Sequence, residues 1–587
     1  MRLRPVVLVA AVTFTCDGVR VEVDAAPGES LLVVLRERLG IVAVKDGCAP
    51  QGQCGCCTVL VDGAPRVACV TPVERVGGRV VTTIAGLDPA VRERFADAFT
   101  ATGGSQCGFC TPGIIMRFAG ERPPAVDRGL AAHLCRCTGW QTITEALDRA
   151  LGTGGDASAR VPDSSGDSSG DSSGDSSGDS PGDSSGDSWV RDRAAAAERA
   201  RLEGGGPQLV GPEVPLGPAL FADDTAPRDA LVAVPLPSGP VPDGVEVVEA
   251  AGCRWVVAES LAAARAGAGK VQGRRTTVDP DPPLLRFLTP VDSLTPRPER
   301  PDGTVALATQ WVEPAYLEPD ASWCTPGGEP ASPLAQGGAF GGKLHSPAPT
   351  AARELADRLG QTVRVVLARE DVVRLGPKRP PIAATARRDG DRVRIDGVAA
   401  PGFPTDVVWP VGDGITVQAS WRTVQVAGPP TNGDLRAVGL AEQAMLVAGA
   451  LGQVPEVVTP SGARASAALE VTDGRITRVR IGLAAGDPLD PVVLRSYAIG
   501  AVHMALGWVC TEGLAVDPTT GEVHDLTIRS FGVPRAAGMP PVGLELLDDP
   551  APPRARATDA VFAATAAAAW LAAGCPVALP VRTLLPR

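Results

Sequence analysis

Closely spaced cysteines near the amino terminus are the feature that most restricts what this chain can fold into. Ten of its fourteen cysteines lie within the first 137 residues, and eight of those form three tight groups. In a chain of 587 residues, Cys-x-x-Cys and Cys-x-Cys spacings favour metal thiolates over the disulfides of a short secreted scaffold. The sequence therefore predicts metal centres held in a reducing compartment, which indicates a cytoplasmic location.

The first group lies in a glycine-rich loop, GCAPQGQCGCCTVLVDG, and is followed by a further cysteine. Its spacing, C-x5-C-x2-C-x11-C, is close to the plant-type ferredoxin spacing, in which such a loop wraps a 2Fe-2S cluster. Glycines can supply positive φ where a Cβ would clash. A zinc ribbon is the alternative, although zinc sites usually pair two C-x2-C knuckles. The predicted ligands are Cys48, Cys54, Cys57 and Cys69, with Cys56 as a spare thiol.

The second group combines SQCGFCTPG, residues 105–113, with LCRCTGW, residues 134–140. Each cysteine pair precedes a helical run, so helix amino termini are expected to face the thiolates and to stabilise their negative charge. Spacing alone leaves zinc open as the metal here. The predicted ligands are Cys107, Cys110, Cys135 and Cys137.

The pattern of elements predicts an α+β multidomain chain. The first 88 residues read as strands, with a type I′ hairpin at Asp17-Gly18 and one helix over residues 30–39. Residues 89–152 read as helical. The GDSS repeat that dominates residues 153–190 cannot bury a core and is expected to be a disordered tether. Beyond it, we expect helices at 351–359, 441–451 and 559–573, and strands at 476–483 and 522–530.

Charge and hydropathy argue against two kinds of partner. Seven aspartates of the repeat account for more than half of the formal charge of −12, and no basic face is concentrated elsewhere, so nucleic acid is a poor partner. No apolar run is expected to approach the 18 residues that a membrane span needs. The opening MRLRPVVLVAAVTF is interpreted as the start of a strand in preference to a signal peptide.

Taken together, VTFTCDGVRVEV, KDGCAPQGQCGCCTVLVDG, QCGFCTPGIIM and LCRCTGWQTI resemble the two iron-sulfur domains of the xanthine dehydrogenase/aldehyde oxidase family. The resemblance runs nearly without gaps from residue 12 to about residue 151. It implies a β-grasp 2Fe-2S ferredoxin domain over residues 1–88 and a four-helix bundle with a second 2Fe-2S cluster over residues 89–152. Gln106 matches the residue that contacts the pterin of the molybdenum cofactor.

The remainder resembles the molybdenum-binding part of the family in pieces. The resemblance implies a shortened first domain over residues 191–310 and an α+β molybdopterin-binding domain over residues 311–587, with the cofactor expected in its cytosine dinucleotide form. LRAVGLAEQ places Arg436 on the substrate side. The family's catalytic base is a glutamate, for which Asp559 is the candidate, although it also reads as an ordinary acid in the first turn of a helix. The loop QGGAFGGK, otherwise a plain turn, resembles a cofactor loop with Gly337, Gly338, Ala339, Phe340 and Gly341.

Only the repeat lies between the iron-sulfur and molybdenum parts, as in flavin-free aldehyde oxidoreductases. The resemblance implies hydroxylation of an aldehyde or N-heterocycle, a small-molecule substrate, with water-derived oxygen. Electrons would pass through both clusters to an external acceptor, for which a separate flavin subunit is one candidate. The oligomeric state is open and includes a homodimer. Because the molybdenum region is short, two alternatives stand: an electron-transfer protein with a vestigial molybdenum domain, and a zinc-bound structural protein.

Overall fold

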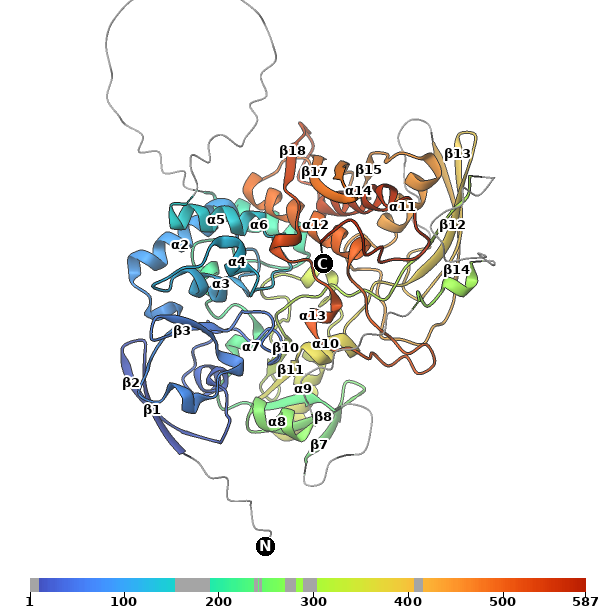
Figure 1. Cartoon of the computed structure of the whole chain (residues 1–587). Helices are drawn as coiled ribbons and strands as arrows, with labels where there is room; N and C mark the ends of the chain where they lie inside the picture. Colours follow the sequence, from blue (N-terminus) through green and yellow to red (C-terminus); the bar gives the residue numbers. More distant parts are fainter. Residues whose placement is uncertain are drawn as a thin grey trace, which may run out of the picture.

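The computed structural model describes residues 10–153, 191–236, 241, 245–269, 281–288, 303–405 and 415–586. Apart from residue 153, the tether predicted for residues 153–190 lies outside the described residues. Figure 1 shows the amino-terminal part, in blue, packed beside the green, yellow and red remainder of the chain. The α+β multidomain class predicted from the sequence is confirmed.

The amino-terminal unit is a five-stranded sheet that packs on a short helix. The hairpin predicted at Asp17-Gly18 is present, and both residues have positive φ, 48° and 82°. The predicted helix is also present, as α1 (Leu31–Val33) continued by a π-helical turn (Val34–Arg38), and the Ser30 side chain accepts a hydrogen bond from the Val33 N–H. In the order β2-β1-β5-β3-β4, the strands are β1 (Ala10–Cys16), β2 (Val19–Ala25), β3 (Thr58–Val61), β4 (Ala64–Val67) and β5 (Val80–Thr82).

Four helices follow this sheet and carry the second pair of cysteine motifs. Asp88 caps the first of them by accepting hydrogen bonds from two backbone N–H groups. The first and last helices of this unit, α2 and α5, pack against each other. The helices are α2 (Pro89–Thr102), α3 (Thr111–Phe118), α4 (Val126–Leu130) and α5 (Gln141–Leu151).

A second five-stranded sheet, in the order β10-β11-β6-β8-β7, lies beyond the tether. Some of its strands precede residue 310 in the chain and others follow it. A domain boundary at that position would therefore divide a single sheet. Helices α8 (Leu261–Gly267) and α9 (Ala348–Leu359) cover its two faces. The strands are β6 (Leu231–Pro235), β7 (Val247–Ala250), β8 (Cys253–Ala258), β10 (Asp320–Cys324) and β11 (Val363–Leu367).

Two four-stranded sheets complete the β-structure of the described residues. The sheet β14-β13-β12-β9 comprises β9 (Val305–Ala308), β12 (Ile382–Asp389), β13 (Arg392–Ala399) and β14 (Thr416–Thr423). The sheet β15-β16-β17-β18 comprises β15 (Val457–Val458), β16 (Arg464–Thr472), β17 (Arg475–Ala484) and β18 (Val542–Leu546).

The carboxy-terminal half is organised around three buried helices. α14 packs against both α11 and α12, and the three contribute to one large hydrophobic core. The helices predicted at 351–359, 441–451 and 559–573 are confirmed as α9, α11 and α14. The helices on this side of the tether include α6 (Arg193–Gly204), α7 (Ala222–Thr225), α10 (Arg369–Leu375), α11 (Leu440–Leu451), α12 (Pro491–Cys510), α13 (Ile528–Phe531) and α14 (Thr558–Ala572).

Two sequence predictions are wrong. Residues 522–530 form no strand: Val523 makes one isolated bridge, and Thr527 caps α13 by accepting from the Ser530 N–H. The side chains of Asp525 and Thr527 bond to nearby backbone and so compete with a ladder. The expectation that no apolar run approaches the length of a membrane span is also wrong, because α12 is long and apolar enough to cross a membrane, with a mean hydropathy of 1.4. Because 89% of that window is buried inside the protein, its environment is that of a core helix.

Candidate functional site

The structure brings the four predicted thiols of the first loop together. Cys48, Cys54 and Cys57 are 1% exposed and Cys69 is 6% exposed. The Cys48 thiol lies within hydrogen-bonding reach of the Cys54 and Cys69 thiols, and Cys57 within reach of Cys69. The Gln51 N–H donates to Cys48 Sγ (3.3 Å), and the Cys69 N–H donates to Cys57 Sγ (3.4 Å). Four convergent, buried thiols with backbone donors aimed at the sulfurs fit a 2Fe-2S cluster.

Two glycines allow this loop to close on its own cysteines. A Cβ on Gly47 would lie 3.2 Å from Cys54 Sγ and 3.3 Å from Cys56 Sγ. Gly55 has a φ of +73°, and a Cβ there would lie 2.5 Å from His133 Nδ1. Gly55 therefore excludes a side chain on the side of the helical domain, whereas a side chain at Gly47 would require the neighbouring cysteines to shift.

The second set of thiols forms two pairs. Cys107 Sγ and Cys137 Sγ lie 3.5 Å apart, and the Cys110 and Cys135 thiols are also paired. Contact with Cys110 lowers the pKa of Cys135 to about 6, and Thr138 Oγ1 lies 3.3 Å from its sulfur. Cys110 is the residue that precedes α3, as the expectation of a helix amino terminus at the thiolates requires. Each pair takes one thiol from residues 105–113 and one from residues 134–140, which together are called the second cysteine loop. Two such pairs fit two irons with two thiolates each.

The two cysteine loops touch each other directly. The Leu134 N–H donates to the Cys54 carbonyl (3.0 Å), and Leu134 precedes Cys135 in the chain. A Cβ on Gly113 would lie 2.4 Å from the Gly55 carbonyl, so α3 approaches the first loop backbone to backbone. One hydrogen bond therefore connects a predicted ligand of the first set with the residue that precedes a predicted ligand of the second, which is a short route for electrons.

Gln106 connects the second cysteine loop to the carboxy-terminal half. Its Nε2 donates to the Cys137 carbonyl and to Ser496 Oγ on α12, both at 3.0 Å. The contact is close, because a Cβ on Gly500 of α12 would lie only 1.9 Å from the Cys137 carbonyl. The predicted pterin-contacting residue is thus at the junction of the two parts of the molecule, where its amide nitrogen is bonded to protein.

The predicted cofactor loop is a tight turn in which Ala339 and Phe340 have positive φ, 50° and 57°. Such backbone strain in residues other than glycine is often found at functional sites. A Cβ on Gly341 would lie 2.2 Å from the Asp434 carbonyl, and one on Gly338 would lie 2.7 Å from the Gly204 carbonyl. Close packing of the chain against itself is therefore sufficient to require these two glycines.

The structure brings Phe340, Arg436 and Asp559 together. The Arg436 guanidinium lies over the Phe340 ring, 4.8 Å from its centroid, and Arg436 Nη2 donates to Thr558 Oγ1 (3.0 Å). Asp559 Oδ1 is 3.6 Å from Arg436 Nε, and Oδ2 is 3.0 Å from Arg556 Nε. The Asp559 carboxylate, in the first turn of α14, is therefore held between two guanidinium groups.

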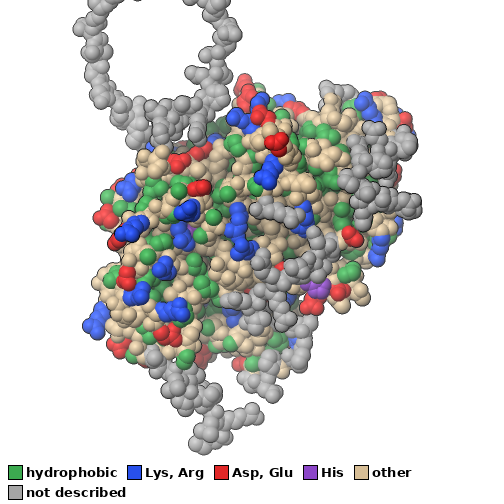
Figure 2. Space-filling model, in the orientation of Figure 1, with side chains coloured by type: hydrophobic (Ala, Val, Ile, Leu, Met, Phe, Trp, Pro, Cys, Tyr) green, Lys and Arg blue, Asp and Glu red, His purple; other side chains and the backbone are tan. Residues whose placement is uncertain are grey.

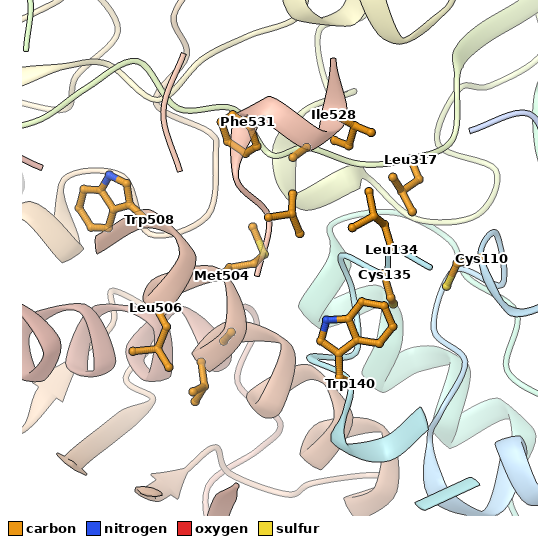
Figure 3. Packing of buried hydrophobic residues seen from close by; sticks show 14 of the residues in the cluster. Cys110, Leu134, Cys135, Trp140, Leu317, Met504, Leu506, Trp508, Ile528 and Phe531 are labelled. Carbon is orange, nitrogen blue, oxygen red and sulfur yellow. The ribbon is translucent and has the colours of Figure 1, made fainter. Parts of the chain in front are cut away.

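A cavity of about 30 Å³ connects the second cysteine loop with Phe340 and Arg436. Two polar atoms on its wall, Glu313 Oε2 and Trp508 Nε1, are buried without a hydrogen-bond partner in the described part of the chain. Figure 3 shows Trp508 and Met504 of α12 in the same view as Cys135 and Trp140 of the second cysteine loop. The residues that line this cavity include Arg136, Phe340, Arg379, Arg436, Glu512 and Phe562, and do not include Asp559.

The sequence analysis missed the buried ion pairs around this cavity. Arg136, which lies between two cysteines, donates through Nη2 to Glu512 Oε2 (2.9 Å) and through Nε to the Pro314 carbonyl (2.8 Å). Burial raises the pKa of Glu512, although Arg136 opposes this effect. Arg379 bonds to Glu442 and stacks over Trp508, 4.2 Å from its ring centroid. The position of Arg136 within Cys-x-Cys was the only local signal, since each partner is distant in sequence.

Fold and site define an oxidoreductase that contains two 2Fe-2S domains. A 2Fe-2S iron-sulfur cluster binding domain matches residues 14–74, and a [2Fe-2S] binding domain matches residues 83–148. The xanthine dehydrogenase iron-sulfur-binding subunit of Escherichia coli O157:H7 is 38% identical over 143 residues, which are 23% of this chain and 89% of that protein. The aldehyde oxidoreductase of Megalodesulfovibrio gigas is 36% identical over 144 residues, 23% of this chain and 16% of that protein.

Among solved structures, the aldehyde oxidoreductase from Desulfovibrio gigas matches with a TM-score of 0.66 at 13% identity, over 97% of this chain and 99% of that chain. The aldehyde oxidoreductase from Desulfovibrio desulfuricans matches with a TM-score of 0.65 at 15% identity. At this identity the likeness concerns the fold, and it extends through both halves of the molecule. The chain belongs to the xanthine dehydrogenase/aldehyde oxidase family.

Proposed function

We propose that this protein is an iron-sulfur molybdenum hydroxylase that oxidises an aldehyde or N-heterocycle and passes the electrons through two 2Fe-2S clusters to an external acceptor. The observation that carries the proposal is the cavity between the second cysteine loop and the Phe340–Arg436 pair. It lies where substrate chemistry and electron exit meet, and its wall holds the two unpartnered polar atoms of Glu313 and Trp508.

The donor sets support the cofactors to different degrees. Cys48, Cys54, Cys57 and Cys69 would hold the first cluster, and the two thiol pairs of the second loop would hold the other. At the molybdenum end, the Glu313 oxygen lacks a donor and the Trp508 indole N–H lacks an acceptor, so together with the guanidinium of Arg436 they fit a polar group that carries both donors and acceptors. We propose molybdopterin in its cytosine dinucleotide form, which requires the side chains around the cavity to open, since a bound organic ligand usually occupies about 300 Å³ or more.

The cofactor, when bound, supplies the two-electron oxidation of the substrate. Arg436, fixed over the Phe340 ring, would orient the substrate by donating to its oxygen or ring nitrogen. Asp559 Oδ2, which also accepts from the Ala437 N–H (3.2 Å), would accept a proton on its remaining lone pair once Arg556, whose side chain is 41% exposed, swings away. Arg136 and Glu512 would hold the second cysteine loop against the cavity wall.

We place the protein in the cytoplasm, where thiolate ligands stay reduced. We also propose an external electron acceptor, such as a separate flavin subunit, and a homodimer.

Metal analysis of the purified full-length chain tests this function. We expect about four iron atoms and one molybdenum per chain, with sulfur-to-iron charge-transfer absorption. Release of a cytosine nucleotide by acid would support the dinucleotide form. Zinc without that absorption would contradict the proposal and would establish the structural alternative.

Substitution of Asp559 tests the proposed base. Asp559→Ala is expected to lower turnover of an aldehyde with a dye acceptor by about a hundredfold or more, as loss of a proton acceptor does. Asp434→Ala is the matched control, because this carboxylate lies nearby but is exposed and pairs only with His345 among the described residues. Equal turnover of the two variants would eliminate Asp559 as the base.

A second function is favoured by one observation. The cavity of about 30 Å³ has room for little more than a water molecule or two, and the glycines of the cofactor loop are packed against the chain itself. These features also suit an electron-transfer protein whose molybdenum region serves as a scaffold. Four iron atoms without molybdenum, in protein from cells that make the cofactor, would establish this second function.

A further inference from the structure

A larger cavity, of about 290 Å³, lies between the ferredoxin domain and the second five-stranded sheet. Figure 1 shows α8 and this sheet beside the blue amino-terminal domain. Apolar side chains form most of the wall: Leu32 and Val33 from α1, Leu261, Ala262 and Ala266 from α8, and Val366 from β11. Its volume is close to the lower end of the range for small-molecule sites.

The arginines on the wall of this cavity are already paired with carboxylates. Three arginines and three carboxylates line it. Arg36 Nη2 lies 2.8 Å from Asp223 Oδ2, Arg265 Nη2 lies 2.7 Å from Glu370 Oε1, and Arg369 is paired with Glu313. Because each arginine on the wall already has a carboxylate partner, no unpaired cation is left to hold an anion, and a neutral ligand suits the cavity better.

Arg369 is the residue of the wall whose hydrogen-bond donors are not all used. The Arg369 side chain is only 1% exposed, yet its Nε and Nη1 have no hydrogen-bond partner among the described residues. A buried N–H without an acceptor is unfavourable, and a ligand oxygen would supply that acceptor. The cavity therefore offers a planar donor group to a carbonyl oxygen beside the apolar side chains that form most of its wall.

The same cavity reaches the loop of the first cluster. Gly47, Ala49 and Pro50, which surround Cys48, line it, and Arg265 Nη2 donates to the Ala49 carbonyl (3.1 Å). A molecule bound in the cavity would thus be separated from Cys48, a predicted ligand of the first cluster, by a single turn of backbone. This position is suited to an electron acceptor.

We propose that the cavity binds a quinone, a neutral planar molecule with an apolar ring and carbonyl oxygens, as the immediate electron acceptor. Binding rests on the cavity alone, whereas reduction rests on the proposed function. The reduced first cluster would give up one electron in each of two transfers, and two protons from water would complete the conversion of quinone to hydroquinone. Each transfer returns the cluster to its oxidised state.

Equilibrium dialysis of the oxidised full-length chain against 2-methyl-1,4-naphthoquinone tests binding without any turnover. We expect saturable binding of about one quinone per chain, which Ala262→Phe, by filling the cavity, weakens by about tenfold or more. Ala263→Phe is the matched control, because Ala263 lies on the same helix, is also exposed, and does not line the cavity. Absence of saturable binding, or equal affinities of the two variants, would overturn the proposal.

Reduction is measured separately, so that the two proposals can fail independently. The clusters are reduced with dithionite, excess reductant is removed, and reoxidation by the same quinone is followed by the visible absorption of the clusters. Ala262→Phe is expected to slow reoxidation by quinone but not by ferricyanide, which needs no cavity. Quinone binding in protein that lacks molybdenum would support the cavity while contradicting the hydroxylase. Hydroxylase turnover with a dye but no quinone binding would do the reverse.

Discussion

Cys56 is a buried cysteine of the first loop that the spacing of the motif leaves outside the predicted ligand set. It is as buried as its neighbours, at 1% exposed, and its thiol lies 3.9 Å from the Cys54 carbonyl. The other four cysteines of the loop contact one another in a chain from Cys54 through Cys48 and Cys69 to Cys57. Because the Cys56 thiol also contacts the Cys54 thiol, neither burial nor contact separates Cys56 from the set of four, and only the spacing of the motif leaves it out.

Substitution of these cysteines by serine separates the two roles. Cys54→Ser is expected to lose the first cluster and about half of the iron, since four thiolates are needed to hold it. Cys56→Ser is expected to keep its full iron content, because a serine fills the same space without removing a ligand. Iron analysis and visible circular dichroism measure both variants. If Cys56→Ser loses as much iron as Cys54→Ser, Cys56 is itself a ligand and the predicted set of four is wrong.

His503 is a buried base in the core helix α12. Burial lowers its pKa to about 3, with Arg136 adding to the effect, and its Nε2 lies 3.0 Å from the Pro534 carbonyl. The folded protein therefore keeps this histidine neutral at a pH at which the unfolded chain, with a pKa of about 6.5, takes up a proton. Unfolding is favoured as the pH falls through this range.

The free energy of unfolding is expected to fall between pH 6.5 and pH 3, with His503 contributing up to about 1.4 kcal/mol per pH unit. Urea titrations at several pH values measure the slope. His503→Asn should have a shallower slope than the natural protein, whereas His524→Asn, at an exposed position, should keep it. Identical slopes in all three proteins would show that His503 takes up its proton in the folded state.

At the scale of helices and strands, the closest approach in the site is between α12 and the second cysteine loop. Gly500 has no room for a Cβ, because the Cys137 carbonyl would be only 1.9 Å away. Gln106 and Ser496 bond across the same junction. The helix and the loop are therefore held in one register, which also positions the cavity beside Phe340 and Arg436.

Gly500→Ala is expected to push the loop away from α12. The electron paramagnetic resonance signal of the second cluster should shift or broaden while that of the first stays unchanged, and the melting temperature should fall. Gly513→Ala is the control, since a Cβ there would meet no atom closer than 3.9 Å and the backbone needs no positive φ. A second-cluster signal that does not change in Gly500→Ala would contradict this packing.

Elements with a strong local signal could be predicted from the sequence. The hairpin at Asp17-Gly18, the helix capped by Ser30 and the alanine-rich α14 depend on neighbouring residues, and all three are present. Residues 522–530 have the composition of a strand, but among the described residues they make only the isolated bridge of Val523, and their polar side chains bond locally. The Arg136–Glu512 pair joins residues 376 positions apart, so no local pattern could reveal it.

At the scale of the whole molecule, buried charges fasten the ferredoxin domain to the rest. Asp224 accepts from Lys45 Nζ (2.6 Å) and from Arg36 Nη2 (3.1 Å), while Asp223 bridges Arg36 and Arg364. Lys45 is 0% exposed. Figure 2 shows charged side chains spread over the visible surface without one large patch of either sign. Charge at this domain contact is thus largely inside, where salt screens it little.

Asp224→Asn should leave the Lys45 ammonium buried without its closest carboxylate. Breaking a buried pair by removing one partner costs about 3 kcal/mol or more, and we expect that loss in the free energy of unfolding, with earlier release of the ferredoxin domain. Calorimetry measures the loss, and limited proteolysis detects the released domain. Asp62→Asn is the control, because its partner Arg79 is exposed and 3.6 Å away, so its loss should cost less than about 1 kcal/mol.

Adding Lys45→Met to Asp224→Asn removes the unpaired charge as well. Since an apolar side chain of similar length costs nothing in desolvated charge, the double variant should recover much of the lost stability. It should also recover quinone binding, because the cavity between the two parts depends on their contact. A double variant less stable than Asp224→Asn would mean that Lys45 contributes chiefly through its bond to the Pro218 carbonyl (3.1 Å), and the domain contact would then depend on hydrogen bonding more than on paired charge.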